Sequence, residues 1–319
     1  MTKVLLTRKL HDFALKELRK HYSIEVHSGK IPMPKKLLLQ KIKDKDGLIC
    51  FPYDTIDKEV IESAKKLRAI STYSVGYDQI DVKTAKKKKI RIGYTPEVLT
   101  KATADLTFSL ILDLLRRVTE GDRIIRKGQW RQIYGAYDYV GVDLAGKTLG
   151  ILGLGRIGQV VAKRAAGFEM NVIYHNRKRT SQKIENSAHA KFESINGLLK
   201  KSDIISVHVP YTKQTHQLVD MKFFKKMKKS AYLINTARGK IIKERDLVSA
   251  LKKKIIAGAA LDVFEFEPIG KNHPLAKMQN VVLAPHIGSS TIETRKKMAE
   301  LTVKNLKLAL AGEKPIYSV

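Results

Sequence analysis

Three polar segments in the second half of the chain carry residue types that can reduce a carbonyl group. They cover residues 235–239, 262–268 and 285–288. Each follows a short apolar run that predicts a strand, and the carboxyl ends of parallel strands form the ligand-binding edge of a sheet. We therefore expect these three segments to lie close together beside a bound ligand.

Each segment supplies one side chain with a defined chemical use. Arg238 can hold the carboxylate of a 2-oxo acid through two parallel hydrogen bonds, which lysine cannot do. A charged His286 can donate a proton to the carbonyl oxygen while hydride reaches the carbon. Glu267, bonded to the other ring nitrogen, would set the tautomer and favour the charged imidazole. Taken singly, they could be an ion pair, a helix-entry residue and a surface acid. Their joint occurrence at three strand ends favours catalysis.

A βαβ unit precedes these segments in the chain. A strand is predicted at residues 147–152, a helix at 159–168 and a second strand at 171–174, with G-x-G-x-x-G at 153–158. That order and a length of about 30 residues are typical of dinucleotide-binding domains. The motif therefore predicts a dinucleotide site.

The glycines of this motif have separate physical tasks. Gly153 permits a tight turn, Gly155 lets a pyrophosphate approach the backbone, and Gly158 lets helix and strand pack closely. N–H groups at the helix start, aided by the helix dipole, would hold the phosphates. The predicted binding residues of the motif are Gly153, Leu154, Gly155, Arg156, Ile157 and Gly158.

Alternating strands and helices run through the rest of the chain. In the first part, strands are predicted at 3–6, 23–26, 47–51, 67–73 and 90–92, and helices at 11–19, 34–42, 57–64 and 81–87. Pro34 is expected in the first turn of its helix. Later strands are predicted at 204–207, 231–235, 258–262 and 281–283. This alternation predicts an α/β fold with doubly wound parallel sheets.

The length of 319 residues indicates two domains. We expect the first domain at 1–99, a dinucleotide-binding domain at 100–288 beginning with a helix at 100–116, and a helix in 289–319 that returns to the first domain. An irregular, aromatic-rich segment at 128–142 is predicted to pack either against another subunit or on its own domain.

Composition narrows the function classes. The net charge of +30 comes from lysines spread along the chain, with runs at the ends of predicted helices. Without a nucleic-acid-binding motif, this favours a lysine-rich proteome over a nucleic-acid partner, and the positive field would attract anionic ligands. A single cysteine, Cys50, excludes an intrachain disulfide and a cysteine-based zinc site. No run is long and apolar enough for a membrane span, and we expect a cytoplasmic protein. We also expect no metal site.

Motifs along essentially the whole chain resemble those of the D-isomer-specific 2-hydroxyacid dehydrogenases. They lie at residues 74–78, 95–100, 146–150, 235–239, 262–268 and 286–289. Within that family the chain looks most like the glyoxylate and hydroxypyruvate reductase branch. The resemblance implies a Rossmann cofactor domain inserted into a flavodoxin-like substrate domain, and a homodimer formed through the cofactor domain, which would explain segment 128–142.

The resemblance also implies roles for particular residues. Arg238, Glu267 and His286 match the family's catalytic residues, and Arg238 and His286 would also bind the substrate. The family loop that binds the substrate carboxylate through backbone N–H groups matches Val75 and Gly76, with Val75 also near the cofactor. The remaining cofactor contacts fall on Thr236, Asp262, His286 and Gly288 near the nicotinamide, and on Val209 and Pro210 near the adenosine.

One departure from the family concerns cofactor choice. NAD-selective members carry an aspartate after the second strand of the βαβ unit, which binds both ribose hydroxyls. This chain has Asn176 there, followed by Arg177, Lys178 and Arg179. Asparagine does not repel a 2′-phosphate, and the basic residues can bind it, so we predict NADP(H) in preference to NAD(H). A solvated basic loop is the alternative.

Other functions share parts of this pattern. A phosphoglycerate dehydrogenase would have the same fold and residues. It is less favoured because we expect no regulatory domain after Val319, although the family also has short forms. A formate dehydrogenase would lack the acid at Glu267. A nucleotide-sensing corepressor would keep the triad, and the charge leaves a secondary nucleic-acid role open. The small 2-oxo or 2-hydroxy acid remains the expected substrate class.

Overall fold

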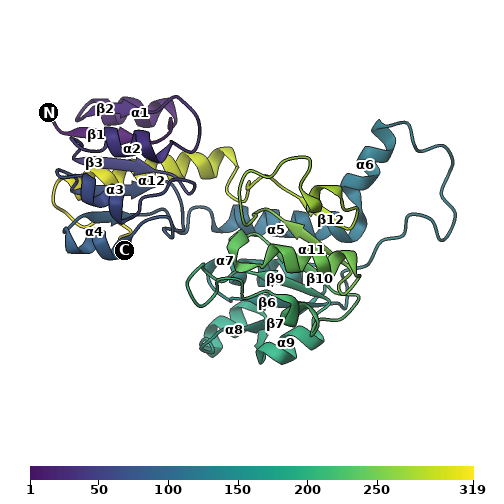
Figure 1. Ribbon diagram of the computed structural model, residues 1–319. Coiled ribbons are helices and arrows are strands. Elements are labelled where there is room, and N and C mark those ends of the chain that lie inside the picture. The colour runs from purple at the N-terminus through teal and green to yellow at the C-terminus, as the bar shows by residue number, and fades with distance from the viewer. The chain divides into compact units, whose positions relative to one another are not determined.

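The computed structural model describes residues 1–319, and two units each surround one parallel sheet (Figure 1). The first unit contains Met1–Leu99 together with Ser289–Val319, and the second contains Thr100–Gly288. Every strand pair in both sheets is parallel. The predicted α/β fold class with two parallel sheets is therefore confirmed.

The sheet of the first unit has the order β2-β1-β3-β4-β5. Its strands are β1 (Lys3–Leu6), β2 (Ser23–Val26), β3 (Gly47–Cys50), β4 (Ala69–Thr72) and β5 (Arg91–Gly93). The central strands β3 and β4 are buried along their whole length, as expected for a parallel sheet covered on both faces. Cys50, at the end of β3, is a fully buried free thiol.

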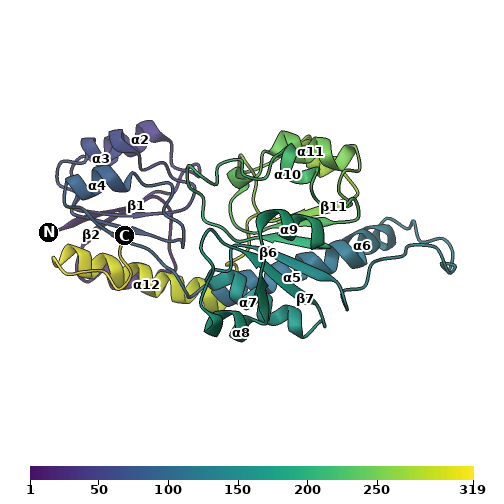
Figure 2. The same cartoon turned by 90° about the horizontal axis from the view of Figure 1, so that it is seen from below.

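Helices cover both faces of this sheet. The helices α2 (Lys35–Lys41), α3 (Lys58–Ser63) and α4 (Val82–Lys87) lie on one face, and α1 (Asp12–Arg19) and α12 (Ile292–Leu310) lie on the other (Figure 2). The C-terminal helix α12 packs mainly on β4, where Ser71 Oγ donates to the carbonyl of Thr302 at 2.9 Å. Pro34 is the N-cap of α2, one residue before the predicted first turn.

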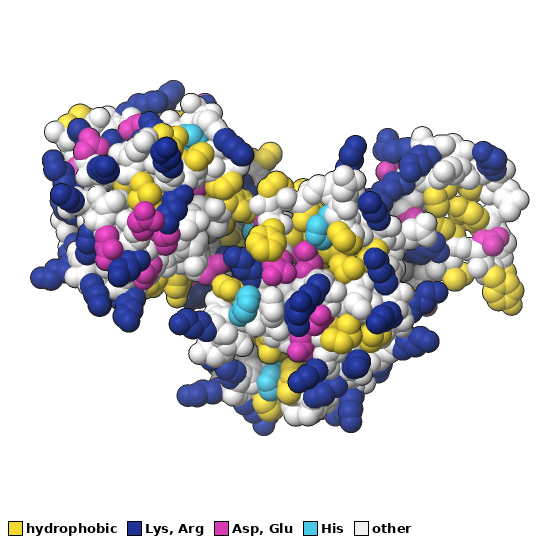
Figure 3. Space-filling model, in the orientation of Figure 1, with side chains coloured by type: hydrophobic (Ala, Val, Ile, Leu, Met, Phe, Trp, Pro, Cys, Tyr) yellow, Lys and Arg dark blue, Asp and Glu magenta, His cyan; other side chains and the backbone are white.

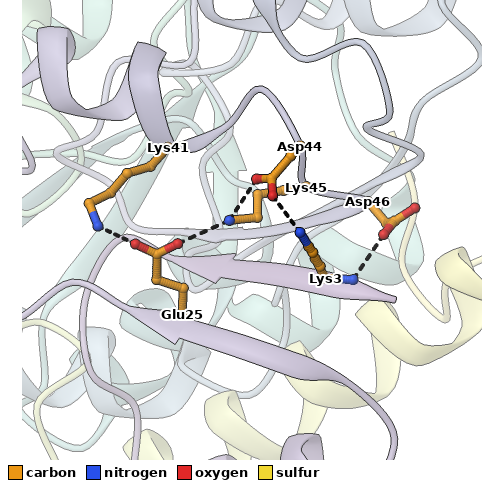
Figure 4. Close-up of polar contacts among 6 residues, drawn as sticks. All are labelled: Lys3, Glu25, Lys41, Asp44, Lys45 and Asp46. Carbon is orange, nitrogen blue, oxygen red and sulfur yellow. Dashed lines mark hydrogen bonds and ion pairs between the residues drawn. The ribbon is translucent and has the colours of Figure 1, made fainter. Parts of the chain in front are cut away.

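A network of ion pairs links β1 and β2 to the end of α2 and the turn before β3 (Figure 4). Nζ of Lys45 lies 2.7 Å from Asp44 and 3.0 Å from Glu25, although this lysine side chain is only 10% exposed. A hydrogen bond from Lys41 is the main cause that lowers the pKa of Glu25, and one from Lys3 lowers the pKa of Asp44. The network therefore favours charged carboxylates.

The second unit has a seven-stranded sheet with the order β12-β11-β10-β9-β6-β7-β8. Its strands are β6 (Thr148–Leu152), β7 (Asn171–His175), β8 (Ala190–Phe192), β9 (Ile204–Val207), β10 (Tyr232–Asn235), β11 (Gly258–Leu261) and β12 (Val281–Leu283). The strand order reverses between β6 and β9. Such a reversal opens a ligand crevice at the carboxyl ends of the two strands.

Two layers of helices enclose this sheet (Figure 2). The helices α5 (Thr100–Arg116), α7 (Arg156–Ala166) and α8 (Gln182–Ala188) contribute to one core, and α9 (Ile195–Lys201), α10 (Met221–Phe224) and α11 (Glu244–Lys252) to the other. Neighbouring residues of β10 alternate between them, because Ile234 faces α5 and Leu233 faces α11. Helix α7 begins three residues before the predicted start, so Gly158 lies in its first turn.

The molecular surface carries the excess positive charge in a dispersed form. Lysine and arginine side chains are spread over both units on the face drawn in Figure 3. The lysine run 86–89 lies at the end of α4, as predicted. None of the helices is long and apolar enough to cross a membrane.

Candidate active site

The three polar segments leave the sheet of the second unit at one edge. Asn235, Leu261 and Leu283 are the last residues of β10, β11 and β12, and they are aligned in register. The loops that carry Arg238, Glu267 and His286 therefore start side by side.

The loop after β10 presents Arg238. The fully buried side chain of Asn235 holds this loop, because its Oδ1 accepts the N–H of Ala237 at 3.0 Å and its Nδ2 donates to the carbonyl of Arg238 at 3.0 Å. A Cβ on Gly239 would lie 1.9 Å from the carbonyl of Phe264, so only glycine fits at this position. Arg238 thus lies on a loop packed directly against the loop of Glu267.

The loop after β11 presents Glu267 to His286. Oε2 of Glu267 lies 2.7 Å from Nδ1 of His286, and Oε1 accepts the N–H of Phe264 at 2.9 Å. The side chains of Glu267 and His286 are 16% and 24% exposed. Because the carboxylate can only accept, Nδ1 carries the proton of this bond, and Nε2 is the remaining ring nitrogen. The structure therefore brings together two of the three predicted catalytic residues in direct contact.

Asp262 holds the backbone that follows His286. Its two carboxylate oxygens accept the N–H groups of Ile287 at 2.7 Å and Gly288 at 2.8 Å. Burial is the main cause that raises the pKa of Asp262, whose side chain is nearly inaccessible. His286 itself has a φ of 54°, a left-handed conformation that is costly for a residue with a side chain. The Asp262 bonds stabilise this conformation.

Two buried threonines on α5 contact the same loops, and the sequence analysis did not identify them. Thr103 Oγ1 donates to the carbonyl of Gly288 at 3.1 Å, and the hydroxyls of Thr107 and Thr236 lie 2.9 Å apart. Both α5 threonines occupy positions that face the core. Polar residues on the apolar face of a predicted helix were the available signal.

The glycine motif has the geometry that a dinucleotide needs. Gly153 has a φ of 105°, and a Cβ there would lie 2.8 Å from the backbone of His208. A Cβ on Gly158 would lie 2.3 Å from the carbonyl of Gly153, whereas the space beside Gly155 is open. The loop therefore leaves room at the start of α7, where Arg156 and Ile157 form the first turn.

The residues after β9 border the same crevice. Val209 is partly buried and Pro210 is exposed, and both follow the strand next to β6. Burial lowers the pKa of the preceding His208 to about 4, and its Nε2 lies 2.8 Å from Ser206 Oγ. His208 is thus a neutral residue at the crevice, which the sequence analysis did not identify.

The segment after β7 contains the residues on which the predicted cofactor preference depends. Oδ1 of Asn176 accepts the N–H of Leu154 in the glycine loop at 2.7 Å. Arg177 and Lys178 are exposed. Arg179, however, forms two 2.8 Å bonds to the buried carboxylate of Glu185. The structure therefore favours Arg177 and Lys178 over Arg179 as phosphate ligands, because the Nε and Nη2 groups of Arg179 already bind Glu185.

In the first unit, residues 74–77 follow β4. Ser74 Oγ donates to the carbonyl of Gly76 at 2.5 Å and lies 2.7 Å from Thr72 Oγ1. These bonds set the path of the chain at Val75 and Gly76, which are both partly buried.

The aromatic segment 128–142 follows α6 (Val118–Arg126), a helix that the sequence analysis did not predict and that has no buried residue. Figure 1 shows α6 and this segment extending away from the rest of their unit. Tyr137 is 94% exposed and Ile133 is 90% exposed. Packing of the whole segment on its own domain, the second alternative above, does not occur in the single chain.

Comparison with known proteins agrees with this geometry. Residues 108–288 match the model of the D-isomer specific 2-hydroxyacid dehydrogenase NAD binding domain. The chain is 48% identical over 314 residues to a glyoxylate reductase of Thermofilum pendens, covering 98% of this chain and 93% of that protein. A glyoxylate reductase of Pyrococcus horikoshii is 46% identical over 316 residues, covering 98% and 94%.

Solved structures show the same likeness. A crystal structure of a Thermus thermophilus protein matches with a TM-score of 0.92 at 43% identity and covers 100% of both chains. An NADPH-dependent glyoxylate/hydroxypyruvate reductase from Sinorhizobium meliloti, in complex with NADP and malonate, matches with a TM-score of 0.89 at 29% identity, covering 100% of this chain and 96% of that one.

Fold, site and likeness together define an NAD(P)-dependent oxidoreductase that acts on 2-oxo or 2-hydroxy acids, and the chain belongs to the D-isomer specific 2-hydroxyacid dehydrogenase family. Within that family it lies in the branch that holds the curated glyoxylate reductases.

Proposed function

We propose that this enzyme reduces glyoxylate or hydroxypyruvate to the corresponding 2-hydroxy acid, with NADPH as the favoured cofactor. The names of the relatives support the substrate class, since several at 42–48% identity are glyoxylate reductases. The structurally similar protein from Sinorhizobium meliloti is named an NADPH-dependent glyoxylate/hydroxypyruvate reductase, a name that contains both proposed substrates and the proposed cofactor.

The proposed catalytic residues are Arg238, Glu267 and His286. The guanidinium of Arg238 binds the substrate carboxylate and orients the adjacent carbonyl carbon. A bound nicotinamide supplies the hydride that reaches this carbon. The Nε2–H of His286 donates its proton to the carbonyl oxygen, so that the oxo group becomes a hydroxyl without a free alkoxide.

The observation that carries this proposal is the 2.7 Å bond between His286 Nδ1 and Glu267. The carboxylate of Glu267 accepts a hydrogen bond from Nδ1–H of His286. The proton on Nε2 is then the one that the imidazolium can donate. When that proton has left, the Nδ1–H tautomer is already the one present. The carboxylate also stabilises the imidazolium that must form again before the next turnover.

Further residues of both units are proposed to bind the remaining groups of substrate and cofactor. Val75 and Gly76 are proposed to bind the substrate carboxylate through their N–H groups, with Val75 also near the cofactor. Thr236, Asp262 and Gly288 are proposed near the nicotinamide. The register of the strand ends β10 to β12 supports the roles of Thr236, Asp262 and Gly288. The roles of Val75 and Gly76 are supported by the family resemblance of these positions.

The remaining cofactor contacts are proposed at the strand ends β6, β7 and β9. Residues 153–158 would hold the pyrophosphate, and Val209 and Pro210 the adenosine. Because Asn176 Oδ1 accepts from Leu154, its Nδ2 donor is left for the ribose or a 2′-phosphate. Exposed Arg177 and Lys178 add positive charge there.

Steady-state kinetics with a panel of 2-oxo acids and both reduced cofactors test the proposal. We expect glyoxylate or hydroxypyruvate to have the highest kcat/KM of the panel, and NADPH a higher kcat/KM than NADH. A preference for a bulky 2-oxo acid would contradict the substrate assignment, and a preference for NADH would contradict the cofactor assignment.

The variant Asn176→Asp tests the cofactor assignment by replacing a single NH2 group with a carboxylate oxygen. Aspartate keeps an oxygen that accepts from Leu154 but repels a 2′-phosphate, so the NADPH:NADH ratio of kcat/KM should fall by about tenfold or more. Arg179→Ala is the matched control in the same segment, because Arg179 binds Glu185, and it should leave the ratio unchanged.

We also propose that the enzyme is a homodimer in which segment 128–142 contacts a second copy. The support is its exposed apolar surface, which includes Trp130 at 54%, Ile133 at 90% and Tyr137 at 94%. Light scattering should give twice the chain mass of 36.0 kDa. Ile133→Asp with Tyr137→Asp should give a monomer, and a wild-type monomer would contradict the proposal.

A further inference from the structure

His273 and Glu244 form a second histidine–carboxylate pair, which contacts the backbone of the loop that carries Glu267. No catalytic step proposed above uses this pair. Nε2 of His273 lies 3.0 Å from Oε1 of Glu244, and the two side chains are only 22% and 15% exposed. The other oxygen of Glu244, Oε2, accepts the N–H of Glu265 at 3.1 Å. Both oxygens of this carboxylate therefore have donors.

The histidine of the pair is oriented by the carboxylate alone. Because the carboxylate of Glu244 can only accept, His273 donates through Nε2. Its other ring nitrogen, Nδ1, is buried and has no hydrogen-bond partner. Such an unsatisfied buried atom is costly. The bond to Glu244 is thus the only side-chain hydrogen bond that holds this ring.

Glu244 connects three separate chain segments. It lies in the first turn of α11, it accepts from residue 265 of the loop after β11, and it holds His273, the N-cap of the 3-10 helix η2 (Pro274–Lys277). This hydrogen bond links the first turn of α11 directly to the backbone of the loop at residues 264–267. Glu244 is therefore the tie between α11 and this loop.

Two carboxylates hold consecutive N–H groups of the loop. Glu267 accepts from Phe264 at 2.9 Å, and Glu244 accepts from Glu265 at 3.1 Å. On the other side, the carbonyl of Phe264 packs against Gly239 so closely that no Cβ fits. The peptide between residues 264 and 265 is consequently fixed from both sides, and this peptide begins the turn that aims Glu267 at His286.

We propose that Glu244 is a positioning residue for Glu267, supported by His273, and that it acts on turnover through the bond between Glu267 and His286. This inference rests on the proton-donor role proposed for His286. Without Glu244, the N–H of Glu265 loses its acceptor, and the turn that carries Glu267 can relax away from the imidazole.

A neighbouring residue provides a matched control. Asp246 also lies in the first turn of α11, and its carboxylate accepts the N–H of Met221 at 3.0 Å. Met221 belongs to α10, which carries none of the proposed catalytic residues. Asp246→Ala and Glu244→Ala thus each remove a carboxylate that ties a backbone N–H to the same helix turn, but only Glu244 is tied to the loop of Glu267.

Steady-state kinetics with glyoxylate and NADPH separate the two effects. Glu244→Ala should lower kcat about tenfold, the loss of one charged hydrogen bond, while both KM values stay within about twofold. Glu244→Gln keeps an acceptor for Glu265 and should retain most of kcat. Asp246→Ala should lower the melting temperature similarly and keep the wild-type kcat. Equal kcat for Glu244→Ala and Asp246→Ala would overturn the proposal.

A double-mutant cycle tests whether Glu244 acts through Glu267. In a Glu267→Gln background, Glu244→Ala should change kcat less than about twofold, because the interaction it supports is already weakened. A full further tenfold loss would show independent effects and overturn the proposal. If Glu244→Ala fails to fold, His273→Gln replaces it in the cycle and should lower kcat severalfold; a wild-type kcat for that variant would overturn the proposal.

The single variant Glu267→Gln separates failure of this inference from failure of the proposed function. A wild-type kcat for Glu267→Gln would refute the role of Glu267 in the reaction, and the inference with it. A low kcat for Glu267→Gln together with a wild-type kcat for Glu244→Ala would leave the proposed function standing and refute the positioning role alone.

Discussion

Replacing Asp262 by asparagine should slow turnover more than it weakens cofactor binding. Asp262 accepts the N–H groups of Ile287 at 2.7 Å and Gly288 at 2.8 Å, which follow the left-handed His286. Asparagine has one acceptor oxygen, so one N–H would face an NH2 group instead. Because the side chain is buried, water cannot replace the lost acceptor.

The expected magnitude follows from that single lost bond. A hydrogen bond to a charged acceptor contributes about 1.5–3 kcal/mol, which corresponds to about a 10- to 150-fold lower kcat if all of it serves to position His286. KM for NADPH should rise by a smaller factor than the factor by which kcat falls. A higher KM for NADPH at unchanged kcat would instead indicate that Asp262 acts mainly as a nicotinamide contact.

The assay measures kcat by steady-state kinetics and the melting temperature by thermal unfolding for the wild type and each variant. Asp203→Asn is the matched control, because Asp203 accepts the N–H of Thr148 at 2.9 Å at the opposite, amino-terminal edge of the same sheet. It should lower the melting temperature but leave kcat unchanged. The reasoning is refuted if Asp262→Asn and Asp203→Asn both turn over at the wild-type rate.

Three further predictions concern ionisable groups away from the reacting atoms. Arg179, through its hydrogen bonds, lowers the pKa of Glu185 to about 2 from 4.5, so their contribution to stability is present above pH 4.5 and lost as pH falls towards 2. Arg179→Ala should accordingly lower the melting temperature at pH 7 and have a diminishing effect in acid. Burial lowers the pKa of His208 to about 4 from 6.5, so stability should fall as pH drops from 6.5 to 4, and denaturant titrations of His208→Gln should show a smaller fall. Burial raises the pKa of the Cys50 thiol, so a thiol reagent should label the protein only after unfolding; rapid labelling of the native enzyme would contradict its burial.

The sequence predicts most of the strands because parallel strands are short apolar runs. Ile204–Val207 and Val281–Leu283 have the predicted bounds, and α5 also begins and ends where its apolar spacing indicates. Helix α6 was missed although its nine residues are amphipathic, because only Val118, Ile124 and Ile125 are apolar, and none of the three is buried in the single chain.

The candidate active site likewise has features that the sequence predicts and features that it does not. Glu267 and His286 could be predicted to meet, since both follow neighbouring strands of one sheet. The bond between Arg179 and Glu185 could not be predicted from the sequence. Glu185 is buried in the structure, but an isolated glutamate in a predicted helix is expected at the surface. The roles of Glu244 and Asp262 depend on which backbone N–H groups lack other acceptors, and only coordinates show that.

The central claim is that His286, held by Glu267, gives the proton that completes reduction of a 2-oxo acid. The direct measurement is glyoxylate-dependent oxidation of NADPH by His286→Ala beside the wild type, with NADPH binding followed by fluorescence. We predict a kcat lower by about 10²- to 10⁴-fold with NADPH affinity retained. A variant that keeps nearly the full rate would contradict the account, because another group would then have to supply the proton.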